Sequence, residues 1–206
     1  VIAVGSAGSY TGCTFIALNL AMELSLLEKS TLLVEANFRA PSLSPLLSMR
    51  KITENTEWKR IAPNLSLSEI TQETSDDLDQ FMSKATDEFD FVVLDIGSIS
   101  GLSNRLTDRR WTSTVTTWCC DQADELMITS RADYLGHHRL VQVIDLLQQT
   151  SIRARLSFTQ NMKSSGKRGD VEMARFLAAT TALKPIRVRS MKQESRSVQA
   201  AEDEHA

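Results

Sequence analysis

The sequence predicts an α/β fold, a three-layer sandwich in which helices flank a mostly parallel central sheet. Short apolar runs alternate along the chain with stretches that have helical periodicity, which is the pattern of strand–helix–strand units with right-handed crossovers. The first run, Val1 to Val4, is apolar and β-branched, as in a strand covered on both faces, and a glycine-bearing turn follows it directly.

Length and composition limit the choices of protein class. The chain has 206 residues, which is enough for one domain with a full core. Its net charge is −3, so we find no strong signal for nucleic-acid binding through overall charge, and we expect the basic stretch 163–168 to be an exposed loop. No segment is long and apolar enough to span a membrane. We expect a single domain over residues 1–206 that is a fragment of a longer chain, because the sequence opens directly in a strand.

The turn after the first strand has the layout of a phosphate-binding loop. Its small residues are Gly5, Ser6, Gly8, Ser9 and Gly12. Small residues let the backbone curl so that successive N–H groups converge on an anion. A helix predicted from Thr14 to about Lys29 adds its positive N-terminal end, and the Thr14 hydroxyl could ligate Mg²⁺. The alternative is a tight strand-to-helix turn that binds nothing.

Two further strands end in carboxylates. The apolar run 30–35 ends at Glu35, and the run 88–97 carries Asp95 just before a glycine. Ligands of open parallel sheets bind beyond the carboxyl ends of the strands, so we expect both acids beside the loop, where they could hold a divalent cation. The alternative for each is an ordinary loop carboxylate.

The rest of the chain continues the alternation. We expect an irregular region over 51–68 with one short extended piece near Leu65. Further elements are predicted as helices over 76–86, about 107–120, 134–149 and 170–179, as strands over 125–130, 153–159 and 185–188, and as the beginning of a helix at 198.

These motifs together resemble the ParA/MinD superfamily of deviant-Walker P-loop ATPases. The helix after the loop contains Ala17–Ala21 (ALNLA), which matches the family's A-x-N-L-A without a gap. Counting back along the family's K-G-G-x-G-K-T-T loop, the signature lysine falls on Gly8 and the Walker lysine on Cys13. The other family positions, three glycines and the magnesium-binding threonine, fall on Ser9, Tyr10, Gly12 and Thr14. Within the superfamily the chain resembles CpaE/TadZ-like and actinobacterial MinD-like proteins most.

Later segments continue the resemblance in order. Residues 32–43 resemble the family's LLIDADLRxPSL, with Glu35 at the first aspartate and Asn37 at the second, which helps to position the attacking water. Residues 89–97 resemble YDYVIIDxPPG, which makes Asp95 the switch II aspartate. Residues 123–133 resemble the following strand, and 196–200 the late segment near the base. Residues 156–161 resemble the strand whose final asparagine, here Asn161, contacts adenine.

The resemblance implies a P-loop NTPase of the SIMIBI/MinD-like class that binds ATP or ADP with Mg²⁺ and forms a homodimer across the loop face. It implies a spatial regulator or scaffold for pilus or secretion-system assembly, or for division or partition, with protein partners from such a machine and a cytoplasmic place near the membrane or cell pole. The implied nucleotide-binding residues are Gly8, Ser9, Gly12, Cys13, Thr14 and Asn161; the metal ligands are Thr14, Glu35 and Asp95; and the catalytic residues are Asn37 and Asp95.

The departures from the family pattern fall on catalytic positions. Neither Gly8 nor Cys13 carries a charge, so the Walker A motif is degenerate. Losing one such electrostatic contact costs about a hundredfold or more in rate, so we expect hydrolysis to be weak or lost. The bulky Tyr10 and Phe15 are hypothesised to fill the space of lysine and phosphate and so close the site.

Two other functions stay open at this point. An active ATPase could use an arginine in place of the lysine, with Arg39, Arg105, Arg109 and Arg110 as candidates, although such arginines are commonly solvated surface residues. A bacterial tyrosine-kinase-like domain is less favoured, because that family ends in a tyrosine cluster and this chain has two tyrosines in all.

The cysteine and histidine residues show no metal-ligand spacing. Cys119 and Cys120 are adjacent, and His137 and His138 lie in a predicted helix. Cys13 lies at a helix N-terminus, where a thiol pKa can be lowered, but no base is placed beside it in the sequence.

Overall fold

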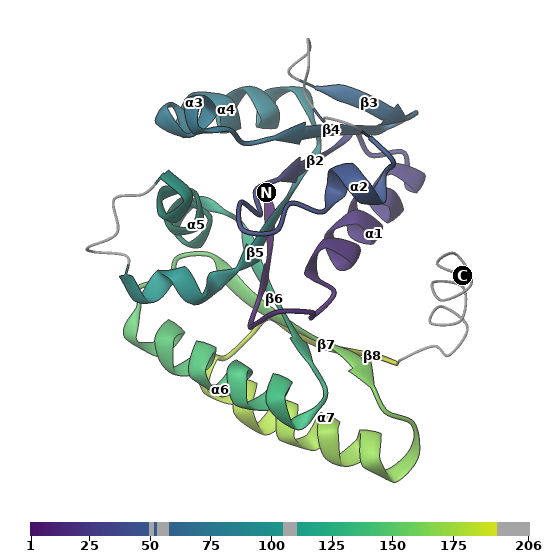
Figure 1. The fold of residues 1–206 in the computed structure, drawn as a ribbon, viewed down its shortest axis with the longest axis vertical. Helices are drawn as coiled ribbons and strands as arrows, with labels where there is room; N and C mark the ends of the chain where they lie inside the picture. Colours follow the sequence, from purple (N-terminus) through teal and green to yellow (C-terminus); the bar gives the residue numbers. More distant parts are fainter. Residues whose placement is uncertain (50–51, 53–57, 105–110, 193–206) are drawn as a thin grey trace.

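The computed structural model describes residues 1–49, 52, 58–104 and 111–192. The predicted elements or candidates at Arg105, Arg109, Arg110, residues 196–200 and the helix from 198 lie outside the described residues. Within the described part, an eight-stranded sheet has the order β3-β4-β2-β5-β1-β6-β7-β8 (Figure 1). The strands are β1 Ile2–Ser6, β2 Thr31–Glu35, β3 Lys59–Ala62, β4 Leu65–Glu69, β5 Phe91–Ser98, β6 Glu125–Arg131, β7 Arg155–Lys163 and β8 Arg187–Lys192.

All neighbouring strands are parallel except β3, which pairs antiparallel with β4. The α/β fold with a mostly parallel sheet is therefore confirmed. The helices are α1 Cys13–Leu26, α2 Leu43–Leu46, α3 Gln72–Asp76, α4 Leu78–Glu88, α5 Trp111–Gln122, α6 Tyr134–Gln149 and α7 Gly166–Thr180, with 3-10 turns at Ile99–Asn104 and Thr181–Leu183.

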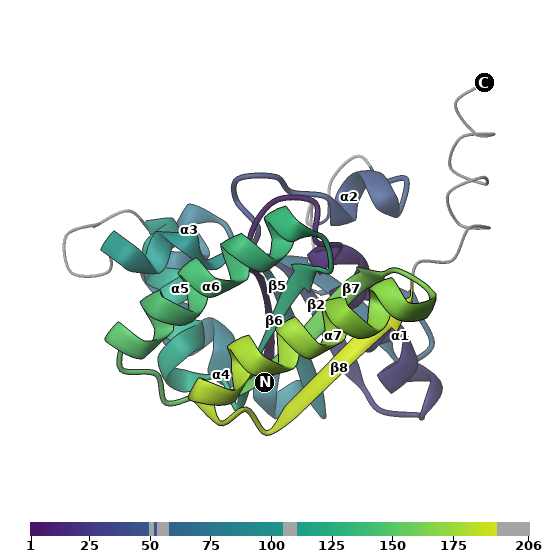
Figure 2. The ribbon, with the colours of Figure 1, turned by 90° about the horizontal axis from the view of Figure 1, so that it is seen from below.

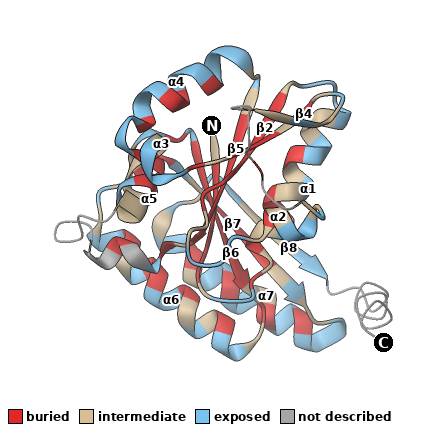
Figure 3. Cartoon of the chain, turned by 45° about the horizontal axis from the view of Figure 1, so that its top comes forward, coloured by how far each residue is buried: buried red, intermediate tan, exposed pale blue. Residues whose placement is uncertain are grey.

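Helices cover both faces of the sheet, so the molecule has three layers. On one face α1 buries Ile16 and Ala17 against sheet residues such as Val93. On the other face α4, α5, α6 and α7 share a second core with the inward side chains of β2, β5 and β6. Helices α6 and α7 lie side by side over the β6–β7 half (Figures 1 and 2). Buried residues concentrate on the central strands and on the inward faces of the helices (Figure 3).

The chain path opens a crevice at the end of β1. From β1 the chain moves outward to β2 and β4, returns to β5 beside β1, and then crosses to β6, β7 and β8 on the other side. A reversal of this kind leaves a gap between diverging loops at the carboxyl ends of the strands, where ligands of open α/β sheets bind. The loop after β1 lies at this point.

Several predicted boundaries differ from the structure. The segment predicted as irregular holds two strands, because Lys59–Ala62 forms a hairpin with β4 at the sheet edge. The helix predicted over 76–86 corresponds to α4, which begins two residues later because the Asp77 side chain accepts the Gln80 N–H, and the short helix α3 before it was not predicted. The prediction of a loop over residues 163–168 is wrong, because β7 continues to Lys163 and α7 begins at Gly166.

Candidate functional site

The loop between β1 and α1, residues 7–12, is held in shape by side chains of the sheet. The Ser6 hydroxyl donates to the Gly8 carbonyl at 2.5 Å and accepts the Gly8 N–H at 3.3 Å. The Thr11 hydroxyl lies 2.9 Å from the Thr129 hydroxyl on β6, and Thr129 donates to the Gly5 carbonyl. These hydrogen bonds therefore hold the backbone of the loop in place without a bound ligand.

Asn161, at the end of β7, closes the loop from the other side. Its Nδ2 donates to the Thr11 carbonyl at 3.0 Å, and its Oδ1 accepts the Met162 N–H at 2.8 Å. Gly12 has φ of 77°, and a Cβ there would lie 2.4 Å from Asn161 Nδ2, so glycine is required on both grounds. The structure thus brings the predicted nucleotide-binding residue Asn161 to the loop, where its observed role is to fasten the backbone.

Cys13, the first residue of α1, points down into the fold. Its thiol lies 3.3 Å from both the Val4 carbonyl and Asp95 Oδ1, and it is buried. Burial and, after it, the neighbouring Asp95 charge raise the pKa of the Cys13 thiol well above its ordinary value. A lowered pKa is therefore a wrong expectation, because desolvation and an adjacent anion outweigh the helix N-terminus. Cys13 is a neutral thiol that brings no positive charge to the loop.

Asp95 on β5 lies beneath the loop and is fully buried. Its Oδ1 accepts from the Cys13 thiol and from the Gly97 N–H at 3.3 Å, while its Oδ2 has no hydrogen-bond partner among the described residues. Burial raises the pKa of Asp95, and polar contacts from Thr14, Cys13 and Gly97 oppose that shift. A buried, half-satisfied carboxylate beside the Thr14 hydroxyl is a donor set that fits a hard cation.

Glu35 ends β2 directly opposite Asp95 in the register of the sheet. Its Oε2 accepts the N–H groups of Ser42 and Leu43 at 2.8 and 2.7 Å, and its Oε1 faces the Asn37 N–H at 3.4 Å. Burial raises the pKa of Glu35 to about 7, and the nearby Asp95 charge adds to the shift. Glu35 therefore fastens the start of α2, and its role as a metal ligand stays a prediction.

Glu35 and Asp95 lie opposite each other on neighbouring strands, but they do not form a complete set of metal ligands. Among the residues that the structure describes, no group of three or more His, Cys, Asp or Glu side chains could hold a metal ion. A Mg²⁺ ion at Thr14 and Asp95 would need water or ligand oxygens to complete its shell.

Asn37 follows β2 and reaches the same end of the sheet. Its Oδ1 accepts the Ala40 N–H at 3.3 Å, and its amide lies against Gly97, where a Cβ would come within 2.3 Å of Oδ1. Arg39 is exposed and lines a small hollow with Asn37 and with Thr112 at the start of α5. The structure therefore places Asn37 against Gly97, two residues after Asp95, and Arg39 beside it in this hollow.

Tyr10 and Phe15 turn outward. Their side chains are 84% and 57% exposed, so the hypothesis that they fill and close the loop is wrong. Tyr10 also has a left-handed φ of 57°, a conformation that costs a non-glycine residue roughly 1–2 kcal/mol. The loop keeps a glycine-like turn at this position although the residue is tyrosine.

A cavity of about 270 Å³ opens between the loop and the start of α6. Arg131 and Asp133, which line it, form an ion pair at 2.6 Å. A second arginine, Arg139 of α6, lies over Gly8. Sequence reasoning did not single out Arg139, because it is one polar residue of an amphipathic helix far along the chain, and no spacing marks its proximity to the loop.

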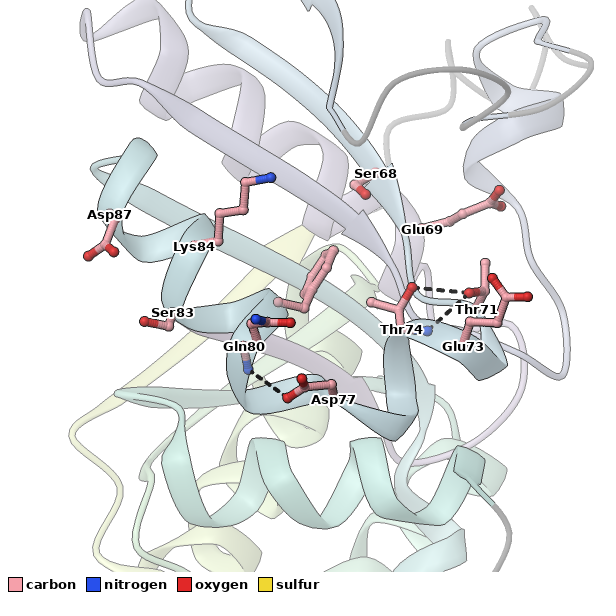
Figure 4. Close-up of a pocket in the computed structure, with 11 residues that line it drawn as sticks. Ser68, Glu69, Thr71, Glu73, Thr74, Asp77, Gln80, Ser83, Lys84 and Asp87 are labelled. Atoms are coloured by element: carbon pink, nitrogen blue, oxygen red, sulfur yellow. Dashed lines mark hydrogen bonds between the residues drawn. The ribbon is translucent and has the colours of Figure 1, made fainter.

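A larger cavity, about 750 Å³, lies elsewhere, over α3 and α4 (Figure 4). Its rim is polar and carries the exposed acids Glu73, Asp77 and Asp87 together with Lys84. The close-up shows Asp77 capping its own helix and Thr74 bonded to Thr71, so these side chains satisfy local backbone and neighbours. We therefore assign the candidate site to the loop, where buried and incompletely satisfied groups converge.

No family model matches this sequence, and no curated protein matches it either. Solved structures do match over almost the whole chain. An ATP complex of McdA from Cyanothece has a TM-score of 0.71 and 16% identity over 97% of this chain and 85% of that one. MinD of Aquifex aeolicus, solved with MinC, has a TM-score of 0.67 and 17% identity over 96% and 83%. A ParA-family ATPase from Chlorobium tepidum has a TM-score of 0.64 and 16% identity over 96% and 86%.

These identities are low, so the likeness concerns the fold. None of the described helices has the length and apolar character needed to cross a membrane. The chain has the fold of the ParA/MinD-type P-loop ATPases.

Proposed function

We propose that this chain is a spatial regulator or scaffold of the ParA/MinD type, which binds ATP or ADP with Mg²⁺ and hydrolyses ATP weakly or not at all. The observation that carries the proposal is the neutral Cys13 thiol, buried on Asp95 at the position where the family's loop has its lysine. The loop leads from β1 into α1 and carries no charged side chain of its own.

The parts needed for binding are retained. Curled backbone N–H groups and the N-terminal end of α1 attract phosphate without a lysine. Thr14 and the orphaned Oδ2 of Asp95 would hold Mg²⁺, which supplies the positive charge next to the phosphates. Asn161 would lie beside the nucleotide, since it already contacts the loop.

The parts needed for rapid hydrolysis are weakened. Phosphoryl transfer depends mainly on positioning and on neutralising charge at the transferred group. Cys13 and Gly8 contribute no charge, and Asn37, which would position the water, is an amide rather than a carboxylate. An active ATPase is a second candidate, because the structure places an arginine, Arg139, against the loop.

The proposed role follows from the fold and its neighbours. McdA, MinD and ParA-family ATPases share this architecture, and MinD is solved as a complex with the cell-division protein MinC. We propose a homodimer across the loop face that serves pilus or secretion-system assembly, as in CpaE/TadZ-like proteins, or division and partition. Its place would be the cytoplasm, close to the membrane or the cell pole.

Calorimetry with Mg-ATP and Mg-ADP, together with light scattering, tests the proposal. We expect micromolar binding that is lost in Thr14→Ala, which removes a magnesium-side hydroxyl, and kept in Thr86→Ala, a matched threonine in α4. We expect a shift from monomer to dimer with nucleotide and slow or absent phosphate release. No binding by the wild type, with a dimer present regardless, would replace the switch by a nucleotide-free scaffold. Rapid turnover abolished by Asp95→Asn would favour the active ATPase instead.

A further inference from the structure

We propose that Arg139 is the cation that binds the phosphate chain of the nucleotide at this loop, in place of the lysine that the loop lacks. The inference rests on the proposed function, since it assigns a residue of α6 to the same ligand. The ligand would be a nucleoside di- or triphosphate, and the paired N–H groups of the Arg139 guanidinium would donate hydrogen bonds to its phosphate oxygens.

The side chain of Arg139 lies against Gly8 of the loop. A Cβ added to Gly8 would lie 2.6 Å from Arg139 Cδ, 3.2 Å from Nη1 and 3.4 Å from Nε. Arg139 therefore occupies the space into which a side chain at position 8 would extend. The resemblance places the family's signature lysine at position 8, so the arginine lies where the missing cation would begin.

The start of α6 places this arginine beside the loop. Asp133 accepts the Gly136 N–H at 2.8 Å and starts α6. A Cβ at Gly136 would come within 2.4 Å of the Arg131 carbonyl, so glycine lets the helix approach the end of β6 closely. Arg139 lies three residues later on the same face of α6, and the close approach brings it onto the loop.

The charged side chains that line the cavity favour an anion. Arg131 is paired with Asp133, whereas Arg139 has no ion pair within the described parts of the chain. Of the charged side chains that line the cavity, two are positive and one is negative, which leaves one net positive charge. Residues 7–14 themselves contain no charged side chain.

A positive side chain beside the loop would offset the charge of the buried Asp95 carboxylate. Asp95 lies buried just below, so a phosphate would meet a negative field if no cation faced it. A guanidinium is planar and always charged, and its paired N–H groups match two phosphate oxygens. Arg139 lines the cavity of about 270 Å³ together with the loop residues Gly8, Ser9 and Tyr10, so a ligand there touches both.

Calorimetric titration of the folded full chain with Mg-ATP and Mg-ADP tests this inference. We expect Arg139→Gln to weaken both affinities tenfold or more and to flatten the dependence of affinity on salt, because one charge contact is lost. Arg139→Lys keeps the charge but not the fork, and we expect an intermediate loss. Arg153→Gln, an exposed arginine at the opposite ends of the strands, is the matched control and should bind like the wild type.

The outcomes separate the two proposals. If the wild type binds and Arg139→Gln binds equally well, the assignment of Arg139 is overturned and the proposed function stands. If the wild type itself does not bind, the proposed function falls and Arg139 falls with it. If Arg139→Gln and Arg153→Gln lose affinity alike, the loss is not specific to the loop and the assignment is overturned. Thermal unfolding of each variant, followed by circular dichroism, verifies that the proteins are folded.

Discussion

The thiol of Cys13 lies 3.3 Å from Oδ1 of Asp95, beneath the loop that connects β1 to α1. The hydrogen bond satisfies one oxygen of a fully buried carboxylate, and the other oxygen stays without a partner among the described residues. The pair therefore leaves the negative charge of Asp95 uncompensated below the loop.

Cys13 should react slowly with thiol reagents. All three cysteines are free and buried, and burial next to Asp95 raises the pKa of Cys13. Because the thiolate is the reactive form, titration of the native protein with a colorimetric disulfide at pH 8 should show no rapid thiol. The same titration in denaturant should show three. A rapid thiol in the native protein that is absent from Cys13→Ser would contradict the buried geometry.

The stability of the protein should fall as the pH rises from about 4.5 to about 7. Glu35 has an ordinary pKa of 4.5 and a pKa of about 7 in the fold. Between these values the folded state holds a proton that the unfolded state has released, so the free energy of unfolding decreases with pH, by roughly 3 kcal/mol at most. The raised pKa of Asp95 acts in the same direction.

Urea unfolding at pH 5 and pH 7.5, with a chelator present, measures this difference. Glu35→Gln keeps an acceptor for the N–H groups of Ser42 and Leu43 but does not titrate, so its stability should change less between the two values. An equal change in wild type and variant would show that Glu35 is not the group responsible.

Gly12→Ala should destabilise the protein more than Gly166→Ala. Both glycines have a left-handed φ, 77° and 63°, so both substitutions incur backbone strain of roughly 1–2 kcal/mol. A Cβ at position 12 would also meet Asn161 at 2.4 Å, whereas nothing lies within 4 Å at position 166. Thermal unfolding of the two variants compares them directly. Equal losses would mean that Asn161 moves aside at little cost.

Asn161→Ala should weaken ATP and GTP binding alike. The Asn161 amide fastens the Thr11 carbonyl, so its removal loosens the loop whichever base is bound. Calorimetry with both nucleotides, and hydrogen exchange of residues 7–14, measure the two effects. A loss for ATP alone, with unchanged exchange, would show that Asn161 reads adenine as the resemblance implies and that its contact with the loop is minor.

The sequence predicted the elements that carry strong periodicity. The helix over 134–149 agrees with α6, and the apolar runs gave β1, β2 and β5 within a residue or a few. Strand β3 was missed because its half-exposed residues show little alternation and its pairing depends on the hairpin with β4. The short α2 was missed for a similar reason, since Glu35 fastens its start from another element.

The candidate site was predictable only where it lies in one segment. The glycine loop and the strand-ending acids are local patterns, and the structure brings them to one end of the sheet. The direction of the Cys13 side chain and the approach of Arg139 depend on packing between distant segments. The outward direction of Tyr10 and Phe15 was likewise not predictable. The size of the two side chains suggested that they fill the loop, whereas in the structure both are exposed.

The contact between Gly8 and Arg139 also has a mechanical consequence. At Gly136 the backbone of α6 lies close to the Arg131 carbonyl, and well-packed interiors do not compress. Helix α6 has 16 residues, about 24 Å at the usual rise, and its inner face is anchored by Leu140, Val143, Ile144 and Leu147. The buried face of α6 therefore holds the backbone of Arg139 at a fixed place beside the loop, so that only its side chain adjusts to a ligand there.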